Sequence, residues 1–217
     1  MVGFIKFCGL PNPTMNIHGR LTCQSGSQSE TIDKVFKVYP GCFFQTNNDV
    51  LGIDKFKNLS TYQPSFVNLT SLSKLVNILS KLFNAFLINC NNFSPYIALG
   101  SKHGIPVAAG IDWNSPSIAL QKMLFSNSKE IWGGEVILNF KVTKKISERL
   151  ISDQKREKLI GSAAWMLDMV IAPDFTGHAL ILLSKREKRL LFSNQNLKKP
   201  TLDTTFVFRF IRGGYLR

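Results

Sequence analysis

The chain has 217 residues, 44% of them hydrophobic, so it is long enough to bury a sizeable core as one large domain or two small ones. Its 27 Lys and Arg residues against 14 Asp and Glu give a formal net charge of +13, which favours a phosphate-bearing or otherwise anionic partner. Its four cysteines are widely spaced, without a CxxC pair or a Cys/His cluster, and suggest neither a zinc site nor a disulfide framework.

The N-terminal segment MVGFIKFCGLPNP lacks the long apolar core of a signal peptide. Nowhere does the sequence approach the roughly 18 uninterrupted apolar residues of a membrane span. We therefore expect a soluble cytoplasmic protein with reduced cysteines and no membrane partner. We also expect one domain, and we find no internal repeat.

The first 65 residues contain short apolar segments separated by polar ones. FIKFC (residues 4–8) and KVFKVYP (34–40) predict strands. CQSGSQSE (23–30) and QTNND (45–49) predict polar loops.

An amphipathic helix is predicted between Leu69 and Phe86. Apolar residues recur there at three- and four-residue steps, which puts them on one buried face of a helix. They are Leu69, Leu72, Val76, Leu79, Phe83 and Phe86. Asn68 precedes them at an N-cap position. An asparagine at this place is as typical of a ligand contact as of a cap, and it can serve as both.

A basic pair, Lys102-His103, follows the apolar strand YIAL (96–99) and precedes small residues and a proline. Taken alone, such a pair is most often a solvated turn. Consecutive side chains point apart in a strand but converge in a turn, and Gly100 and Gly104 permit the bend that this requires. The pair is therefore either a turn in solvent or the centre of an active site.

The remainder of the chain alternates helices with strands. Helices are predicted at SPSIALQKMLF (115–125, with Pro116 in the first turn), at 145–160 and at FTGHALILLSK (175–185). Strands are predicted at EVILNF (135–140), AWMLDMVIAP (164–173), RLLF (189–192) and TTFVFRFIRGG (204–214). This alternation predicts an α/β sheet with helices on its faces.

Three further features carry weaker signals. Asp168 lies inside a nearly continuous apolar strand, and because burying an unpaired carboxylate is costly, it must find a donor or a cation. Trp132, Gly133 and Gly134 lead into the next predicted strand, a pattern as typical of structural backbone as of a ligand loop. The basic run KREKR (185–189) is typical of a solvated link, and without interleaved aromatic residues it does not indicate nucleic-acid binding.

The order of these motifs resembles the formyltransferase domain of the AICAR transformylase/IMP cyclohydrolase family of purine biosynthesis. The motifs are an Asn before an amphipathic helix, Lys-His after the next strand, aromatic-Gly-Gly before a strand, then VIAPDFTGHALILLSK and a closing IRGGYL. The similarity begins at IKFCGLPNP, near residue 4, and runs to the last residue. It implies a cytidine-deaminase-like mixed sheet with helices on both faces.

The resemblance also implies site residues by position. Lys102 and His103 correspond to the family's catalytic Lys-His pair. Asn68 corresponds to an asparagine that helps to hold the aminoimidazole nucleotide, and Trp132-Gly133 to the nucleotide loop. The implied substrate is an anionic small molecule of nucleotide type, and the implied formyl donor is 10-formyltetrahydrofolate.

Other correspondences are looser. Asp168 matches the acidic residue just before the family's Ile-Ala-Pro motif. Lys6 and Phe7 stand where the family opens with Arg-Tyr, which weakens bidentate phosphate recognition because Lys is a point charge and Arg a planar fork. Ile105 stands where the family has a polar residue before the proline.

Formyl transfer to an aromatic amine needs a base for the amine proton and a cation for the oxyanion that forms at the formyl carbon. Histidine gains and loses a proton near neutrality, so His103 is the expected general base. The Lys102 ammonium is expected to stabilise the oxyanion. No metal is required, and the H-x-E and P-C-x-x-C ligands of the zinc deaminases are absent from the sequence.

The family's formyltransferase region has two related halves, and residues 1–217 correspond to the first. The resemblance therefore implies a single half-domain whose activity needs a homodimer, a partner chain or a changed chemistry. Three alternatives stay open: another acyl transfer or cyclisation on a specialised substrate, a non-catalytic half-domain that binds a nucleotide or a partner, and nucleic-acid binding with an affinity that falls steeply with salt.

Overall fold

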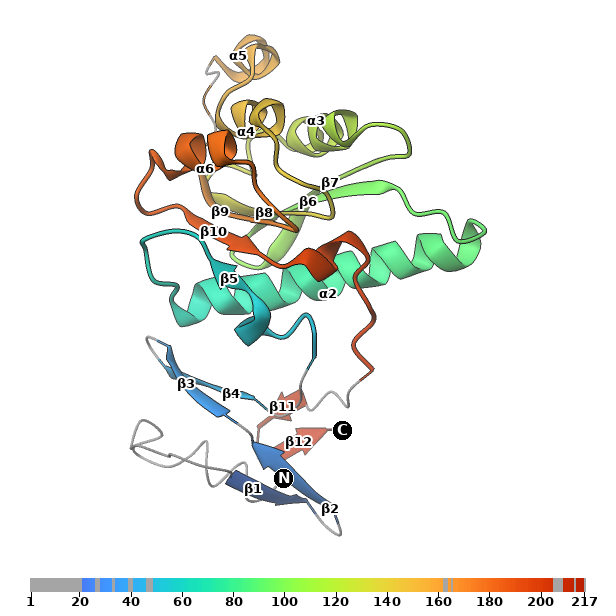
Figure 1. The fold of residues 1–217 in the computed structure, drawn as a ribbon, viewed down its shortest axis with the longest axis vertical. Helices are drawn as coiled ribbons and strands as arrows, with labels where there is room; N and C mark the ends of the chain where they lie inside the picture. The colour runs from blue at the N-terminus through green and yellow to red at the C-terminus, as the bar shows by residue number, and fades with distance from the viewer. Residues whose placement is uncertain are drawn as a thin grey trace.

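A six-stranded mixed sheet forms the centre of the computed structural model (Figure 1). The structure describes residues 21–25, 28–32, 34–38, 41–45, 49–161, 164, 166–204, 209–212 and 214–216. In spatial order the strands of the sheet are β5 (Lys57–Asn58), β10 (Leu190–Ser193), β9 (Leu167–Ala172), β8 (Gly134–Leu138), β6 (Tyr96–Lys102) and β7 (Ile105–Asp112). The three strands β8, β9 and β10 run parallel, and the other neighbours pair antiparallel.

Helices cover both faces of this sheet. Figure 1 shows α2 (Phe66–Asn89) on one side, and α3 (Pro116–Ser126), α4 (Lys144–Ile151) and α6 (Gly177–Ser184) on the other. Each side has its own apolar core, one built on α2 and the other on the three shorter helices. The predicted α/β fold, a mixed sheet with helices on both faces, is confirmed.

Helix α2 is longer than predicted and has a different cap. Ser65, not Asn68, is the N-cap residue, and its hydroxyl oxygen accepts a hydrogen bond from the Asn68 backbone N–H. The predicted apolar stripe does face the sheet, since Leu72 and Leu79 are fully buried. Among the described helices, α2 alone is long and apolar enough to cross a membrane by length and composition, although one of its faces packs against the sheet.

The strands β8 and β9 lie at the middle of the sheet, which explains their apolar sequences. All five residues of β8 are buried, and so are five of the six in β9. A parallel strand covered by helices on both faces needs apolar side chains at nearly every position. The strands predicted at 135–140 and 164–173 are thus confirmed with narrower bounds.

Strand β7 was missed by the sequence analysis, because its residues IPVAAGID are small and include a proline. A proline is tolerated here because β7 is the edge strand of the sheet, where one row of backbone N–H groups has no partner strand. Gly110 lets α3 pack closely, since a Cβ atom there would lie 2.1 Å from the Ala119 carbonyl oxygen.

The helix predicted over 145–160 is in fact two. Helix α4 ends at Ile151, and the next residue, Ser152, has an extended backbone that bridges to Ala164. Helix α5 (Gln154–Ile160) then starts from a new N-cap, Asp153, whose carboxylate accepts from the Lys155 N–H. An aspartate side chain that accepts from nearby backbone N–H groups favours the start of a new helix over the continuation of the previous one. The charged sequence alone did not reveal this break, so one helix was predicted.

Three separate two-stranded sheets complete the described residues. They are β1 (Leu21–Ser25) with β2 (Gln28–Ile32), β3 (Lys34–Val38) with β4 (Gly41–Gln45), and β11 (Arg209–Ile211) with β12 (Gly214–Leu216). The loop predicted over 23–30 is wrong for its described residues, because they belong to β1 and β2, and polar residues are compatible with antiparallel strands. The strand predicted over 34–40 is confirmed for Lys34–Val38, while residues 39–40 and the strand predicted at FIKFC lie outside the described residues.

Candidate active site

Lys102 and His103 lie at the tip of the β6–β7 hairpin. Lys102 pairs with Ile105 across the hairpin, so His103 and Gly104 form a two-residue turn. Both residues have positive φ angles, 54° and 72°, as a type I′ turn requires. A histidine in this left-handed region is uncommon and is held there only by well-defined surroundings. The turn therefore fixes the backbone at an exposed imidazole.

Helix α2 provides those surroundings. Gly104 is buried, and a Cβ atom there would lie 3.0 Å from Lys74 Cδ and 3.5 Å from Ser71 Oγ. Ser71 and Lys74 follow Asn68 at three-residue steps, so the three residues lie on the same side of the first turns of α2. The structure thus places the Lys102-His103 turn against the helix face that begins with Asn68.

Asn68 has a structural role that is distinct from the ligand contact predicted for it. Its Oδ1 accepts hydrogen bonds from the Ser65 backbone N–H at 2.9 Å and from Ser65 Oγ at 2.7 Å, which completes a capping box. Its Nδ2 amide makes no hydrogen bond to any residue that the structure describes. A ligand contact from Asn68 would consequently use the amide hydrogens as donors.

The Trp132-Gly133 segment leads into β8 beside the end of β6. Gly133 has a φ of 71°, and its N–H donates to the Met166 carbonyl. Gly134 lies directly on the Ser101 backbone, since a Cβ atom there would be 2.4 Å from the Ser101 carbonyl oxygen. The predicted loop and the hairpin turn therefore share one edge of the sheet, with Trp132 38% exposed beside it.

Glu135 is a candidate site residue that the sequence analysis missed. It is only 6% exposed, and its Oε2 accepts a hydrogen bond of 2.7 Å from Ser101 Oγ, one residue before Lys102. Side chains alternate along a strand, so Glu135 points to the same face as Ile137, the face that α2 covers. The available signal was an acidic residue at the start of an otherwise apolar strand, because a buried carboxylate is costly.

Asp168 forms an ion pair with Arg186, as predicted for a carboxylate within an apolar strand. Its Oδ1 accepts a hydrogen bond of 2.8 Å from Arg186 Nη2, and its side chain is 45% exposed. The ion pair connects β9 to the α6–β10 loop. The structure therefore pairs Asp168 with Arg186 and not with the hairpin turn.

The KREKR run links α6 to β10, and residues 185–188 are exposed or partly exposed as predicted, whereas Arg189 turns inward. Arg189 is 5% exposed and donates from Nε to the Leu167 carbonyl at 3.0 Å and from Nη1 to the Leu183 carbonyl at 2.9 Å. Burial lowers the pKa of its guanidinium below the usual value, with a further lowering from Arg186. A sequence pattern of alternating charge does not reveal which single arginine turns inward.

Two predictions remain, the contacts of Lys6 and Phe7 and the question of a metal site. Lys6 and Phe7 lie outside the described residues. No group of three or more His, Cys, Asp or Glu residues that could hold a metal ion occurs in the part of the chain that the structure describes.

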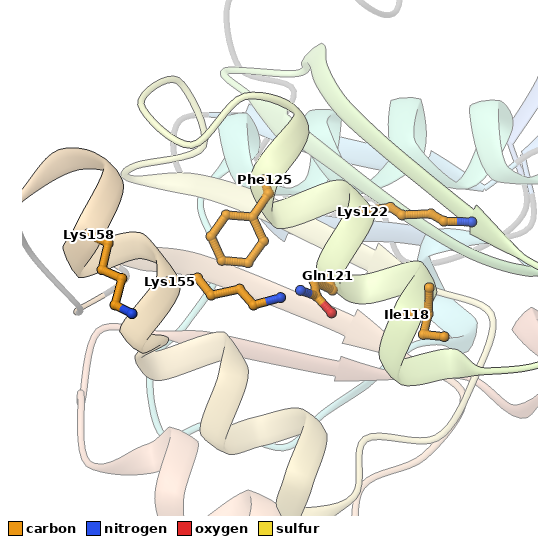
Figure 2. Close-up of a pocket in the computed structure, with 6 residues that line it drawn as sticks. All are labelled: Ile118, Gln121, Lys122, Phe125, Lys155 and Lys158. Atoms are coloured by element: carbon orange, nitrogen blue, oxygen red, sulfur yellow. The ribbon is translucent and has the colours of Figure 1, made fainter.

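A cavity of about 510 Å³ lies between α3 and α5, away from all the predicted site residues (Figure 2). It is lined by Ile118, Gln121, Lys122, Phe125, Lys155 and Lys158. Lys122 is engaged with Asp112 Oδ2 at 2.9 Å, while Figure 2 shows the Lys155 amine directed toward Gln121.

Comparisons with known proteins agree with the motif order. The family model described as AICARFT/IMPCHase bienzyme matches residues 40–217. The bifunctional purine biosynthesis protein PurH of Staphylococcus carnosus is 34% identical over 134 residues, which cover 61% of this chain and 24% of that protein. PurH of Staphylococcus aureus strain JH1 is 29% identical over 175 residues, covering 80% of this chain and 30% of that protein.

The chain thus spans less than a third of the length of these curated relatives. Among solved structures, a putative formate dehydrogenase accessory protein from Desulfotalea psychrophila aligns with a TM-score of 0.41 and 12% identity, covering 77% of this chain and 66% of that one.

Proposed function

Since the chain belongs to the AICARFT/IMPCHase bienzyme family, we propose that it acts in purine biosynthesis as a single formyltransferase-type half-domain spanning residues 1–217. The proposed reaction transfers a formyl group from 10-formyltetrahydrofolate to the amine of AICAR or a related acceptor. The relatives are named for a bifunctional role in purine biosynthesis. The observation that carries the proposal is the Lys102-His103 turn, seated on α2 and bordered by the Gly133-Gly134 segment.

His103 is the proposed general base. It lies at an exposed turn tip, within reach of a substrate in solvent, and its backbone is fixed by the type I′ geometry. A base must take the proton from the acceptor amine as the amine nitrogen forms its bond to the formyl carbon, and the same group can return that proton to N10 of tetrahydrofolate as the bond between the formyl carbon and N10 breaks. Such a base contributes about 10²- to 10⁴-fold to a rate.

Lys102 is the proposed oxyanion stabiliser. Lys102 is the last residue of β6 and pairs with Ile105, so it lies next to the base on a backbone of fixed geometry. A positive charge close to the oxygen of the tetrahedral intermediate lowers the barrier, because the negative charge on that oxygen develops only as the reaction proceeds.

The proposed acceptor contacts come from three elements that meet this edge of the sheet. Asn68 supplies an amide donor from α2, and Trp132-Gly133 supplies an aromatic face and backbone ahead of β8. Asp168 retains Oδ2 for a ligand amine or hydroxyl while Oδ1 holds Arg186. Lys6 and Phe7 are proposed to bind the acceptor phosphate by correspondence with the family's opening Arg-Tyr.

We further propose that the site is completed by a second copy of the chain or by a partner chain. The proposed location of the protein is the cytoplasm. No residue within the described part of the chain forms a hydrogen bond with the His103 ring, whereas a catalytic base is usually oriented by a further group. The same observation favours the second candidate function, a half-domain that binds a nucleotide without turnover.

The test is tetrahydrofolate release when the purified chain is mixed with 10-formyltetrahydrofolate and AICAR. The sharpest variant is His103→Asn, because asparagine tolerates the left-handed backbone and removes only the imidazole. We expect turnover to fall by about 10²- to 10⁴-fold with unchanged thermal stability.

Lys185→Gln, an exposed change of charge at a residue outside the proposed site, is the matched control and should leave turnover unchanged. Equal turnover in wild type and His103→Asn would refute the proposed base. AICAR binding without turnover in the wild type would favour the binding half-domain.

A further inference from the structure

A second cavity lies at the opposite end of the sheet from β7, beside the edge strand β5. Its volume is about 490 Å³, within the range of small-molecule sites. It is lined by Leu59, Ser60, Thr61, Tyr62, Ser184, Arg186, Glu187, Lys188 and Arg189. One wall is the segment after β5 and the other is the α6–β10 loop, the two of which approach each other in Figure 1. None of the proposed catalytic residues lines it.

The cavity carries an excess of positive charge. Three of its lining residues are cations, Arg186, Lys188 and Arg189, and one, Glu187, is an acid. Arg189 is buried, and its two described hydrogen bonds go to neutral backbone carbonyls. A buried guanidinium without a carboxylate of its own costs free energy that a bound anion would offset. The nearby acids are Glu187 and Asp168, the latter held by Arg186.

Both walls are fixed before any ligand arrives. Asn58 closes the first wall, since its Nδ2 donates to the Tyr62 carbonyl at 2.9 Å and its Oδ1 accepts from the Ser60 N–H at 3.0 Å. The Arg189 N–H donates to the Arg186 carbonyl at 2.9 Å and closes the second wall. A preformed site loses little conformational entropy on binding, which favours affinity.

The polar groups suit a phosphate. Arg186 has Nε and Nη1 free of hydrogen bonds within the described residues, and Arg189 has Nη2, so both guanidinium groups can donate charged hydrogen bonds to phosphate oxygens. The hydroxyls of Thr61 and Tyr62 make no hydrogen bond within the described residues, so they remain available as donors. The Ser60 hydroxyl is occupied by Asn58. Tyr62 also offers a half-exposed ring to the organic part of a ligand.

We propose that this cavity is a second ligand site, which binds a small organic phosphate through Arg186, Lys188 and Arg189. The phosphate lies between the two arginines, and Tyr62 contacts the rest of the molecule. Since Arg186 also holds Asp168, the ligand competes with that carboxylate for the same guanidinium. Phosphate binding therefore weakens the ion pair between Asp168 and Arg186, and loss of that ion pair strengthens phosphate binding.

The test is isothermal titration calorimetry of the full chain with ribose 5-phosphate, with inorganic phosphate and ribose as the two partial probes. We expect binding of ribose 5-phosphate, weaker binding of inorganic phosphate and none of ribose. Lys188→Gln should weaken binding about 10- to 100-fold, as loss of one charged hydrogen bond does. Lys185→Gln removes the same charge from the same basic run without touching the cavity and should change nothing.

Two more variants separate this site from the proposed catalytic one. Lys102→Gln should leave ribose 5-phosphate binding intact, and a loss there but not in Lys188→Gln would overturn the proposal. Asp168→Asn should tighten binding about two- to fivefold, the value of a half-exposed ion pair, because Arg186 is released. Equal losses in Lys188→Gln and Lys185→Gln would also overturn it, as would binding of an oligonucleotide but not of ribose 5-phosphate.

Discussion

Two basic segments of this chain lie in opposite surroundings. In the β6–β7 hairpin, the Lys102-His103 pair is at a turn tip, where the backbone is fixed and the imidazole is exposed. In the α6–β10 loop, Arg189 is buried and its side chain is fixed by two carbonyl groups. A fixed backbone with an exposed side chain suits proton transfer, whereas a fixed, buried cation suits the binding of an anion.

The difference follows from what each segment packs against. The hairpin turn contacts Ser71 and Lys74 through a glycine, which has no side chain to bury. The α6–β10 loop joins a helix to a central part of the sheet, so one of its long side chains covers the end of β9. The aliphatic part of an arginine can pack in such a place while its head group satisfies carbonyl oxygens.

The largest effect on stability is expected from Arg189→Met. The substitution leaves the Leu167 and Leu183 carbonyls buried without their donors, which costs about 1–3 kcal/mol for each carbonyl. Part of this cost is offset because a charge is no longer buried. We expect the free energy of unfolding to fall by about 2–4 kcal/mol in urea titrations.

Arg186→Gln is the matched control in the same loop. It breaks a half-exposed ion pair and should cost less than about 1 kcal/mol. If the two variants were equally stable, Arg189 would be no more fixed than Arg186, and the contrast between the two segments would fail.

The hairpin can be tested in the same way through Gly104→Ala. An alanine with a φ of 72° should lower the free energy of unfolding by about 1–2 kcal/mol because of its left-handed backbone, and its Cβ would lie only 3.0 Å from Lys74 Cδ. Gly161 is the control, since its φ is 74° and a Cβ atom added there would meet nothing within 4 Å. Gly104→Ala should therefore destabilise the chain more than Gly161→Ala, as measured by urea unfolding. Equal losses would mean that the turn does not rest on α2.

The sequence predicted the parts of this molecule that depend on local periodicity. The stripe from Leu72 to Phe83 is a 3.6-residue pattern, and the apolar run of β9 is that of a doubly covered strand. Strand β7 has neither pattern and was missed, because an edge strand of small residues has no distinctive period. The helix cap was misplaced by three residues, since Ser65 and Asn68 bond reciprocally and either suits an N-cap.

The candidate site was predictable only in part, because its contacts join distant segments. The motif order predicted Lys102 and His103 as site residues, and the structure places Gly104 of the same turn against α2. The hydrogen bond from Ser101 to Glu135 and the ion pair of Asp168 with Arg186 depend on which strands are neighbours in the sheet. No spacing along the chain encodes that adjacency, so the hydrogen-bond partner of Glu135 and the inward turn of Arg189 could not be found from sequence.

The smallest expected effect concerns the far end of the same hairpin, where β7 ends at Asp112. Its carboxylate accepts hydrogen bonds from Lys122 and from the Asn114 and Ser115 N–H groups, and these lower its pKa from the usual value of 3.8. A depressed pKa stabilises the folded chain above pH 3.8, and this contribution is lost as the pH falls through the lower, folded value.

Urea midpoints measured at about pH 6 and about pH 3 should therefore drop further in the wild type than in Asp112→Asn, which has no charge to lose. Because the Lys122 side chain is 54% exposed, added salt should reduce the difference. If added salt lowers the stability contributed by the exposed Lys122 but not that contributed by the buried Arg189, then burial, and not charge, distinguishes the roles of these two cations. Identical pH profiles in both proteins would mean that the contacts of Asp112 are too exposed to contribute.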